Sequence, residues 1–362
     1  MKKILVFNLT PRFGMLHYSA QFCNALTKKY QVSVAIADYY KGDLYDKDIE
    51  LIKLKTNPNL KSFIFDTLNI FQHIKLLRKI QKEKPDIVHF IDNHPWYIFY
   101  GRLLKLLWYT TYVTQHDPIL HSGDSKWIQW KVAVMTNKVL RNVADKLIVH
   151  GENLKTDLVN QYNVDAKKIT VVPHWNYNFF TRRSKENVTP IPDSFLFFGR
   201  IVDYKWLDIL LESLEFVRKN NQNFVLIIAW SWNIDKYKKL LQRYEKNIQL
   251  YNENIPDEEV RKYFKMSEFV ILPYRDATGS GVIPVAFAFS KAVIVSNTGE
   301  LGTCTNDAKG WIVIDNLTPK SLAEQIVWML ENKEETKKLG NNGRKYTEEV
   351  LGWDKIIKNI YS

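Results

Sequence analysis

Short apolar runs alternate along this chain with longer segments whose apolar residues recur at the spacing of a helix. In the first half, runs typical of buried strands fall at 3–9, 31–37, 87–91, 111–115, 146–149 and 169–172. In the second half they fall at 195–198, 224–229, 269–273, 292–296 and 311–314. Helical patterns include 18–29, 68–82, 320–330 and a segment from 334 onward. This alternation predicts an α/β protein with doubly wound parallel sheets.

Length and composition indicate two domains. Single hydrophobic cores stop growing near ~250 to 300 residues, and this chain has 362. Apolar residues are scarce at 180–194, where two prolines also occur, so we interpret this stretch as the linker. We predict Rossmann-like domains at 1–185 and 186–345 that face a central cleft, and a helix in 346–362 that packs back towards the first domain. Ligands of such sheets bind at the carboxyl ends of the strands.

Cysteine and charge patterns limit the function classes. Cys23 and Cys304 are 281 positions apart, which excludes a disulfide framework or a cysteine-built zinc site and favours a reducing cytosol. The uncharged runs are shorter than the ~20 residues of a membrane span. The apolar run at the amino terminus is too short for a signal peptide. We therefore expect a cytoplasmic protein.

The positive charge lies entirely in the first half of the chain. Residues 1–186 contain 28 Lys and Arg against 16 Asp and Glu, a net charge of +12, whereas residues 187–362 contain 23 of each. One interpretation is a solvated surface. The other is an anionic partner, such as lipid headgroups or a pyrophosphate-linked acceptor. Nucleic acid is not expected, because no zinc-finger, RNP-type or helix-turn-helix pattern is present.

A candidate phosphate site follows the predicted strand at 195–198. Gly199 and Arg200 come directly after the strand, and Lys205 lies five residues further on, before an amphipathic helix. Two cations and free N–H groups at the carboxyl end of a strand are suited to bind a phosphate. By spacing alone, a pair of surface cations is the alternative.

This segment resembles the "GR-x4-K-G-x-D-x-LL" motif of glycosyltransferase family 4, with Trp206 in place of the usual glycine. Further similarities occur in the family's order at 84–89, 144–150, 168–174, 255–259 and 352–356, so the resemblance covers nearly the whole chain. It implies the GT-B fold and a sugar-nucleotide transferase that retains anomeric configuration. It also implies that Arg200 and Lys205 hold the donor diphosphate, and that no dedicated enzymatic nucleophile is needed.

The segment 274–296 resembles the family's donor loop and helix. The donor-binding residues implied there are Gly279, Ser280, Gly281 and Val282, where glycines let the backbone approach a ligand. Most relatives carry two glutamates eight residues apart around this loop. Here Ala277 and Val285 occupy those positions, and Asp276 is a candidate substitute for the first. The loop is similar to a subgroup that has an "A-T-x-S-G-V" sequence and lacks the glutamate pair.

Three further candidate segments each follow a predicted strand. Residues 11–18 correspond to the family's glycine-containing loop near the donor phosphate and the acceptor. The resemblance therefore implies that Gly14 is a donor-binding residue. The predicted strand at 111–115 is followed by His116 and Asp117, which are well placed to contact a sugar, and His121 is a weaker candidate. Where relatives have a glycine-rich turn, this chain has Trp230-Ser231-Trp232, whose indoles either stack on a base or sugar or cover the edge of the core.

Two other segments have alternative interpretations. Asp46-Lys47-Asp48 has the D-x-D form of metal-dependent transferases, but it lies in a polar stretch, 41–55, into which no buried strand leads. We therefore predict no metal. The apolar segment 96–109 has only Arg102 and Lys105 as charges, which suits either a buried helix or a helix lying on a bilayer surface.

Taken with the family resemblance, these observations predict a retaining, metal-independent glycosyltransferase without a cofactor. The expected donor is a UDP- or GDP-linked sugar, and the expected acceptor is a glycan or lipid-linked acceptor in cell-surface polysaccharide or glycoconjugate synthesis. An anionic membrane surface is a further expected partner, which would make the protein peripheral on the inner face of the membrane. The alternatives are a sugar-nucleotide epimerase or phosphorylase of the same fold and a catalytically silent partner protein. The presence of Arg200, Lys205 and the 280–281 loop argues against the silent partner.

Overall fold

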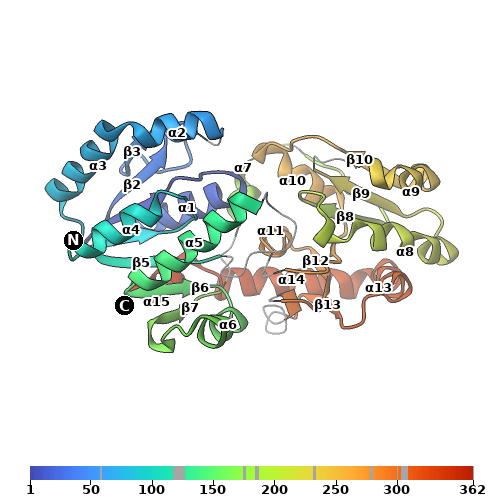
Figure 1. Ribbon diagram of the computed structural model, residues 1–362. Coiled ribbons are helices and arrows are strands. Elements are labelled where there is room, and N and C mark those ends of the chain that lie inside the picture. The colour runs from blue at the N-terminus through green and yellow to red at the C-terminus, as the bar shows by residue number, and fades with distance from the viewer. Residues whose placement is uncertain are drawn as a thin grey trace. The chain divides into compact units, whose positions relative to one another are not determined.

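The computed structural model describes residues 1–57, 59–116, 127–173, 177–183, 187–230, 234–277, 280–299, 301–302 and 309–361. The chain divides into two compact units, each built around its own sheet (Figure 1). Unit 1 consists of Met1–Val172 and Trp353–Ser362, and unit 2 consists of Pro173–Gly352.

A seven-stranded parallel sheet forms the centre of unit 1, in the order β3-β2-β1-β4-β5-β6-β7. Its strands are β1 (Lys3–Asn8), β2 (Gln31–Ala37), β3 (Glu50–Leu54), β4 (Ile87–Phe90), β5 (Thr110–Thr114), β6 (Lys146–Val149) and β7 (Ile169–Val171). The strand order reverses between β1 and β4. Such a reversal is where open α/β sheets bind ligands, outside the carboxyl ends of the strands.

Helices cover both faces of this sheet, and the alternation of side chains along β4 shows how. Val88 and Phe90 join the hydrophobic core on one face. That face is covered by α3 (Ile70–Glu83), α4 (Tyr97–Leu106), α5 (Trp127–Val143) and α6 (Glu152–Tyr162). His89 points to the opposite face, because successive side chains of a strand alternate. There its ring lies 5.4 Å from the ring of Phe22 in α1 (Phe13–Leu26).

The last helix, α15 (Trp353–Tyr361), returns to unit 1 and packs against α1. The Tyr361 hydroxyl lies 2.7 Å from Nδ1 of His89, and the Lys146 ammonium donates a hydrogen bond to the Ile360 carbonyl at 2.7 Å. At the other end of the helix, the ring of Trp353 lies 5.7 Å from that of Tyr18. A segment far away in sequence therefore covers one face of the first sheet.

Unit 2 has a six-stranded parallel sheet in the order β10-β9-β8-β11-β12-β13. Its strands are β8 (Ser194–Phe198), β9 (Val225–Ala229), β10 (Ile248–Tyr251), β11 (Phe269–Leu272), β12 (Ala292–Ser296) and β13 (Trp311–Ile314). Phe195 and Phe197 point into a core shared with α8 (Leu207–Asn220) and α13 (Pro319–Glu331). On the other face the ring of Phe198 lies 5.0 Å from that of Phe264 in α10 (Asp257–Met266). The strand order reverses at β8 and β11, which places the Gly199–Lys205 turn at the switch point.

The predicted pair of doubly wound parallel sheets is confirmed. The strands β3 and β10 were not predicted, since both lie at sheet edges and are only partly buried. The helix expected at 68–82 is preceded by a separate helix, α2 (Leu60–Leu68), and the two meet at Asn69. The helix expected at 18–29 already begins at Phe13.

The boundary between the units differs from the linker expected at 180–194. It falls between Val172 and Pro173. The short helix α7 (Phe179–Arg183) lies within the expected linker, but it contacts α10 and α11 (Val282–Ala288) of unit 2. The carbonyl of Thr181 accepts a hydrogen bond from the Arg261 guanidinium at 2.7 Å. These contacts place the segment in unit 2.

Candidate active site

The turn after β8 is built around Gly199 and Lys205. Gly199 has φ +101°, a region that residues with a side chain rarely adopt, and a Cβ there would lie 2.5 Å from Nζ of Lys205. Lys205 is only 7% exposed. Its Nζ lies 3.5 Å from the carbonyl oxygen of Phe198 and 5.1 Å from the ring centroid of Tyr274. The glycine therefore leaves the space in which a cation lies at the carboxyl end of the strand.

Arg200 and Trp206 complete this turn. Arg200 follows the glycine and is exposed. Trp206 has φ 56°, a left-handed conformation at the position where relatives carry glycine, and α8 begins at the next residue. The guanidinium of Arg275 lies 4.6 Å above the ring of Trp206, and the Arg275 N–H donates to the Tyr204 carbonyl at 2.7 Å. These contacts connect the turn to the segment that follows β11.

The Ser280–Val282 segment lies against the same turn. A Cβ on Gly199 would be 3.9 Å from Cγ2 of Val282, so the two motifs meet although about 80 residues separate them. The Val282 N–H donates to the Ser280 hydroxyl at 3.3 Å. A Cβ on Gly281 would approach the Tyr177 hydroxyl to 3.2 Å, which explains the glycine there. Gly279 lies outside the described residues.

The positions of the family's glutamate pair lie in the apolar interior. Ala277 is 4% exposed and Val285 is 6% exposed. Asp276, the candidate substitute, is exposed at the residue before Ala277. Burial raises the pKa of the nearby Tyr274 phenol, which therefore stays neutral near pH 7. Neither position of the expected glutamate pair carries a carboxylate in this chain.

Trp230 packs on the strand that leads into the turn. Its ring lies 5.4 Å from the ring of Phe198 in a T-shaped arrangement. Its backbone has φ 142°, and its N–H donates to the Tyr251 carbonyl at 3.1 Å. The position therefore has the positive φ that favours glycine, and the indole contacts the edge of the core. Trp232 lies outside the described residues.

In unit 1, His116 pairs with a histidine that the sequence did not single out. Nδ1 of His116 lies 3.0 Å from Nε2 of His150, and Nε2 of His116 lies 3.0 Å from the carbonyl oxygen of Ile91. Because a carbonyl only accepts, the contact with Ile91 requires a proton on Nε2 of His116, and Nδ1 of His150 likewise lies 3.4 Å from the carbonyl oxygen of Val172. Burial lowers the pKa of His150 to about 4, so it is neutral near pH 7. Both ring nitrogens of His116 thus have partners within the protein.

The loop after β1 is held by a buried carboxylate that the sequence analysis also missed. Asp92 accepts a hydrogen bond from the Thr10 N–H at 2.6 Å and one from the Tyr97 hydroxyl, which itself accepts from the Leu9 N–H at 3.0 Å. Burial raises the pKa of Asp92 to about 6, and the bonds from Tyr97 and Thr10 oppose that shift. Gly14 follows this loop, exposed in the first turn of α1.

Both missed residues had a sequence signal. Asp92 comes just after β4, and His150 comes just after β6. The carboxyl ends of parallel strands meet at one edge of a sheet, so polar residues just after them gather there.

Asp117 and His121 lie outside the described residues. Asp46 and Asp48 are exposed, four and two residues before β3.

In the part of the chain that the structure describes, no three His, Cys, Asp or Glu side chains come together in a way that would hold a metal ion. None of the helices described is both long enough and apolar enough to cross a bilayer.

Comparisons with known proteins identify the families that the chain resembles. The family model "Glycosyltransferase Family 4" matches residues 14–175, and the model "Glycosyl transferases group 1" matches residues 179–346. An uncharacterized glycosyltransferase of Methanocaldococcus jannaschii is 28% identical over 63% of this chain, a match that spans 57% of that protein's length. The capsular polysaccharide biosynthesis glycosyltransferase CapM of Staphylococcus aureus is 24% identical over 92% of this chain and 90% of its own length. Spore coat protein SA of Bacillus subtilis is 21% identical over 93% of this chain and 90% of its own length.

Solved structures share the fold at low sequence identity. Sucrose-phosphate synthase from Thermosynechococcus elongatus superposes with a TM-score of 0.74 at 16% identity, covering 98% of this chain and 96% of that one. Anabaena HepE in complex with UDP-glucose has a TM-score of 0.73 at 14% identity, covering 99% of this chain and 98% of that one. Staphylococcus aureus TarM, solved with UDP and a glycosylated glycerol, gives 0.69 at 14%, covering 99% of both chains. With two glycosyltransferase family models that together span residues 14–346, the chain is a glycosyltransferase of the GT-B fold that resembles family 4.

Proposed function

We propose that this protein is a retaining, metal-independent hexosyltransferase. It transfers a sugar from a nucleotide-sugar donor to a glycan or lipid-linked acceptor in the synthesis of cell-surface polysaccharide or glycoconjugate. The observation that carries the proposal is the buried Lys205, held at the carboxyl end of β8 beside Gly199 and Val282. A cation at this place, with Arg200 next to the glycine, is suited to a diphosphate.

The proposed reaction requires stabilisation of charge on the leaving group. When the bond between the sugar and the donor phosphate breaks, negative charge develops on the departing oxygen, and Lys205 and Arg200 stabilise that charge. The acceptor hydroxyl attacks from the same face, and its proton passes to the departing phosphate oxygen. The new bond therefore forms with retention. Oriented binding of donor and acceptor supplies much of the remaining rate enhancement.

Relatives support the class of donor and acceptor. HepE is solved with UDP-glucose, and TarM is solved with UDP and α-GlcNAc-glycerol. CapM is named for capsular polysaccharide biosynthesis. We propose that unit 2 binds the nucleotide sugar and that unit 1, which holds His116 and most of the positive charge, binds the acceptor. The role proposed for His116, with Asp117 beside it, is to contact a sugar.

The site accounts for a reaction without a metal, because Lys205 and Arg200 supply the positive charge that a divalent cation supplies elsewhere. We also propose a peripheral location on an anionic membrane surface, since the net charge of +12 lies in residues 1–186.

A ligand screen tests the proposed donor site. Thermal unfolding is measured with UDP, GDP and their sugar conjugates, and a ligand present at 100 times its dissociation constant stabilises the fold by roughly 2.7 kcal/mol. We expect stabilisation by one nucleotide family in the wild type and none in Lys205→Met. Transfer is then assayed with that donor, with and without EDTA, and equal rates are expected. Loss of transfer on chelation, restored by Mn²⁺ or Mg²⁺, would contradict metal independence, and conversion of the donor without an acceptor would indicate an epimerase.

A further inference from the structure

Exposed apolar side chains are concentrated on one group of helices in unit 1. Of the eighteen large apolar side chains that are exposed in the described part of the chain, thirteen lie between residues 64 and 135. They are Ile64, Phe65, Leu68, Ile70, Phe71, Ile74, Phe99, Leu106, Leu107, Trp108, Trp130, Val134 and Met135. Single exposed apolar residues are normal, but a concentration of this kind indicates an interaction surface. We call these thirteen side chains, with α2, α3, α4 and α5 that carry them or lead into them, the apolar helical face.

The most exposed side chains are large and lie at helix ends. Trp108 is 94% exposed, Phe71 85%, Phe65 75% and Leu106 74%. Phe65 and Phe71 flank the turn at Asn69 where α2 meets α3, and Leu106 and Trp108 lie at the end of α4. In unit 2, by contrast, the described large apolar side chains are at most 39% exposed. Helix ends therefore present aromatic rings almost fully to the surroundings.

The same helices carry a strong positive charge. Together α2, α3, α4 and α5 contain ten Lys and Arg but only two acidic residues, Asp66 and Glu83. Lys79 pairs with Glu83 on its own helix and with Glu50, and Lys105 pairs with Asp145. Lys75, Arg78 and Arg102 are exposed. The apolar helical face thus combines insertable apolar side chains with cations, which is the pattern of a surface that lies in the interface of an anionic bilayer.

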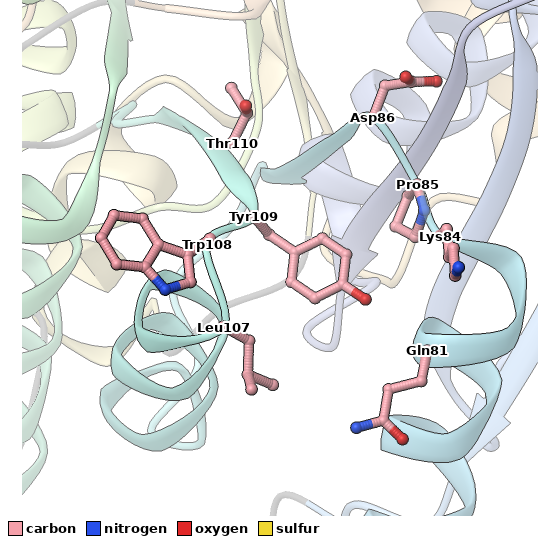
Figure 2. A pocket seen from close by; sticks show the side chains of 8 residues that line it. All are labelled: Gln81, Lys84, Pro85, Asp86, Leu107, Trp108, Tyr109 and Thr110. Carbon is pink, nitrogen blue, oxygen red and sulfur yellow. The ribbon is translucent and has the colours of Figure 1, made fainter.

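Two hollows occur among these helices. One has a volume of about 640 Å³ between α2 and α4 and combines apolar walls, Phe63, Trp96, Phe99 and Leu103, with the cation of Arg102. The other, of about 480 Å³, is lined by residues at and after the ends of α3 and α4, including both Lys84 and the carboxylate Asp86. Figure 2 shows the Tyr109 phenol pointing towards Lys84 in this second hollow, while the Trp108 indole extends to the other side. The hollow between α2 and α4 is suited to an acyl chain, with a headgroup phosphate near Arg102.

We propose that the apolar helical face docks on an anionic lipid bilayer, with Phe65, Phe71 and Trp108 inserted among the lipids. The exposed cations of the four helices, such as Lys75, Arg78 and Arg102, contact headgroup phosphates. The proposal deepens the peripheral location proposed above and rests on it. It adds which surface of the protein binds the bilayer. It also adds that insertion of apolar side chains contributes to the free energy of binding, beyond the attraction due to net charge. Cations attract the chain to the membrane, and burial of the aromatic rings holds it there.

A second copy of the chain fits this face less well than a bilayer. A symmetric dimer through the face would bring the same surface of each copy together. In each copy the four helices carry ten cations and two anions, so the two positively charged surfaces would repel each other. Nucleic acid would be attracted by the cations, but the aliphatic tips of Leu68, Ile70 and Leu106 offer it no hydrogen bonds. An anionic bilayer matches both the charge and the apolar side chains.

Vesicle co-sedimentation of the full chain tests the proposal. The vesicles contain phosphatidylcholine alone or mixed with phosphatidylglycerol, and we expect binding to the mixed vesicles. Phe65→Ser with Phe71→Ser leaves the net charge unchanged and should weaken that binding by about tenfold or more, since two rings no longer leave water. Trp328→Ser, which changes an exposed apolar side chain of unit 2, is the matched control and should bind like the wild type.

Fluorescence gives a second readout that reports insertion itself. Mixed vesicles should shift the tryptophan emission to the blue, and Trp108→Phe should remove most of that shift whereas Trp328→Phe retains it. Wild-type binding by the Phe65→Ser/Phe71→Ser variant, together with an unaltered shift in Trp108→Phe, would overturn the proposal. Sedimentation velocity without lipid should show a monomer. A wild-type dimer that the same two serines dissociate would assign the face to a second copy instead.

Failure of this proposal is distinguishable from failure of the proposed enzyme. The substituted side chains are exposed and lie outside the candidate active site, so the variants should keep the wild-type melting temperature and the wild-type rate with a water-soluble acceptor. If docking is absent while transfer to that acceptor persists, only the membrane surface is wrong. If docking is present but no nucleotide sugar reacts, only the proposed transfer is wrong.

Discussion

At the scale of single residues, the arrangement of Gly199 and Lys205 shows how a turn can hold a buried cation. The backbone of Gly199 has φ +101°, and the space that a Cβ would occupy is taken by Nζ of Lys205. The lysine thus depends on the glycine for room and on the Phe198 carbonyl and the Tyr274 ring for its surroundings. The position of the lysine charge therefore depends on the backbone conformation of the glycine. A substitution of Lys205 changes the charge, and a substitution of Gly199 changes the backbone.

Removal of either cation should impair transfer. We expect Arg200→Ala and Lys205→Ala each to lower the rate on the order of 100-fold or more, by analogy with the loss of one preorganised donor to a developing oxyanion. Lys205→Met removes the charge but keeps an apolar chain, so it separates charge from packing. Lys219→Ala, at an exposed position of the last turn of α8, is the control. Steady-state kinetics give kcat/KM for each variant, and wild-type turnover in both alanine variants would refute the diphosphate assignment.

Gly199→Ala tests the backbone contribution. An alanine at φ +101° is strained by at least about 1 to 2 kcal/mol, and its Cβ would displace the lysine ammonium. We expect a lower melting temperature and weaker nucleotide binding, measured by thermal unfolding and by titration. Gly352→Ala is the matched control, because a Cβ there would have only an ordinary contact at 3.6 Å with Glu348. Equal behaviour of the two variants would show that the turn tolerates a side chain.

At the scale of secondary-structure elements, α15 is attached to the first sheet by few but specific contacts. His89 lies between the Tyr361 hydroxyl at 2.7 Å and the Thr114 hydroxyl at 2.9 Å, and all three groups are polar atoms in a buried region. A buried polar group that loses its partner costs more than the bond itself contributes. The helix therefore depends on this pair as well as on its apolar face.

Tyr361→Phe should destabilise the protein by about 1 to 3 kcal/mol, because it leaves a buried nitrogen of His89 without its partner. Urea unfolding followed by circular dichroism measures the change. Tyr162→Phe removes a hydroxyl from a tyrosine that is 40% exposed and should have little effect. If the two variants unfold at the same urea concentration, the hydrogen bond does not fasten α15.

The sequence predicted the buried elements and missed the half-buried ones. Strands β2, β6, β12 and β13 occur at the predicted bounds, because continuous apolar runs are characteristic of parallel strands covered on both faces. The edge strands β3 and β10 have a weaker apolar pattern, since one side of each strand lacks a neighbour. At the site, the Gly199–Lys205 turn was recognisable from its motif. The pairing of His116 with His150 was not, because it joins two strand ends 34 residues apart through contacts that only the register of the sheet defines.

At the scale of the whole molecule, the two units differ in their titratable groups. Seven of the eight histidines belong to unit 1. Burial lowers the pKa of His89 and of His94 to about 3 and that of His150 to about 4. A folded state that keeps these rings neutral is fully stable above the unfolded pKa of about 6.5, and it loses stability as the pH falls below that value, because the unfolded chain binds protons that the folded chain does not.

Acidification should therefore loosen unit 1 before unit 2. Between pH 6.5 and 5 we expect the stability of unit 1 to fall while that of unit 2 changes little. Asp92 of unit 1, whose pKa burial raises to about 6, binds a proton in the folded state in this range and so opposes the loss, but three histidines outweigh one carboxylate. Hydrogen exchange resolved by peptide, corrected for the intrinsic rate at each pH, measures the two units in one experiment. An equal loss of protection in peptides of both units would contradict this expectation.

The discontinuous course of unit 1 has a consequence for its biosynthesis. The chain leaves this unit at Val172 and returns only at Trp353. During translation at about 5 to 20 residues per second, the ribosome needs roughly 10 to 40 s to make the segment between them. For that time the rings of Tyr18 and Phe22, which Trp353 later covers, have no α15 above them. One apolar face of the nascent first sheet therefore stays uncovered until α15 has been synthesised. During this interval the chain is most exposed to aggregation and most dependent on chaperones.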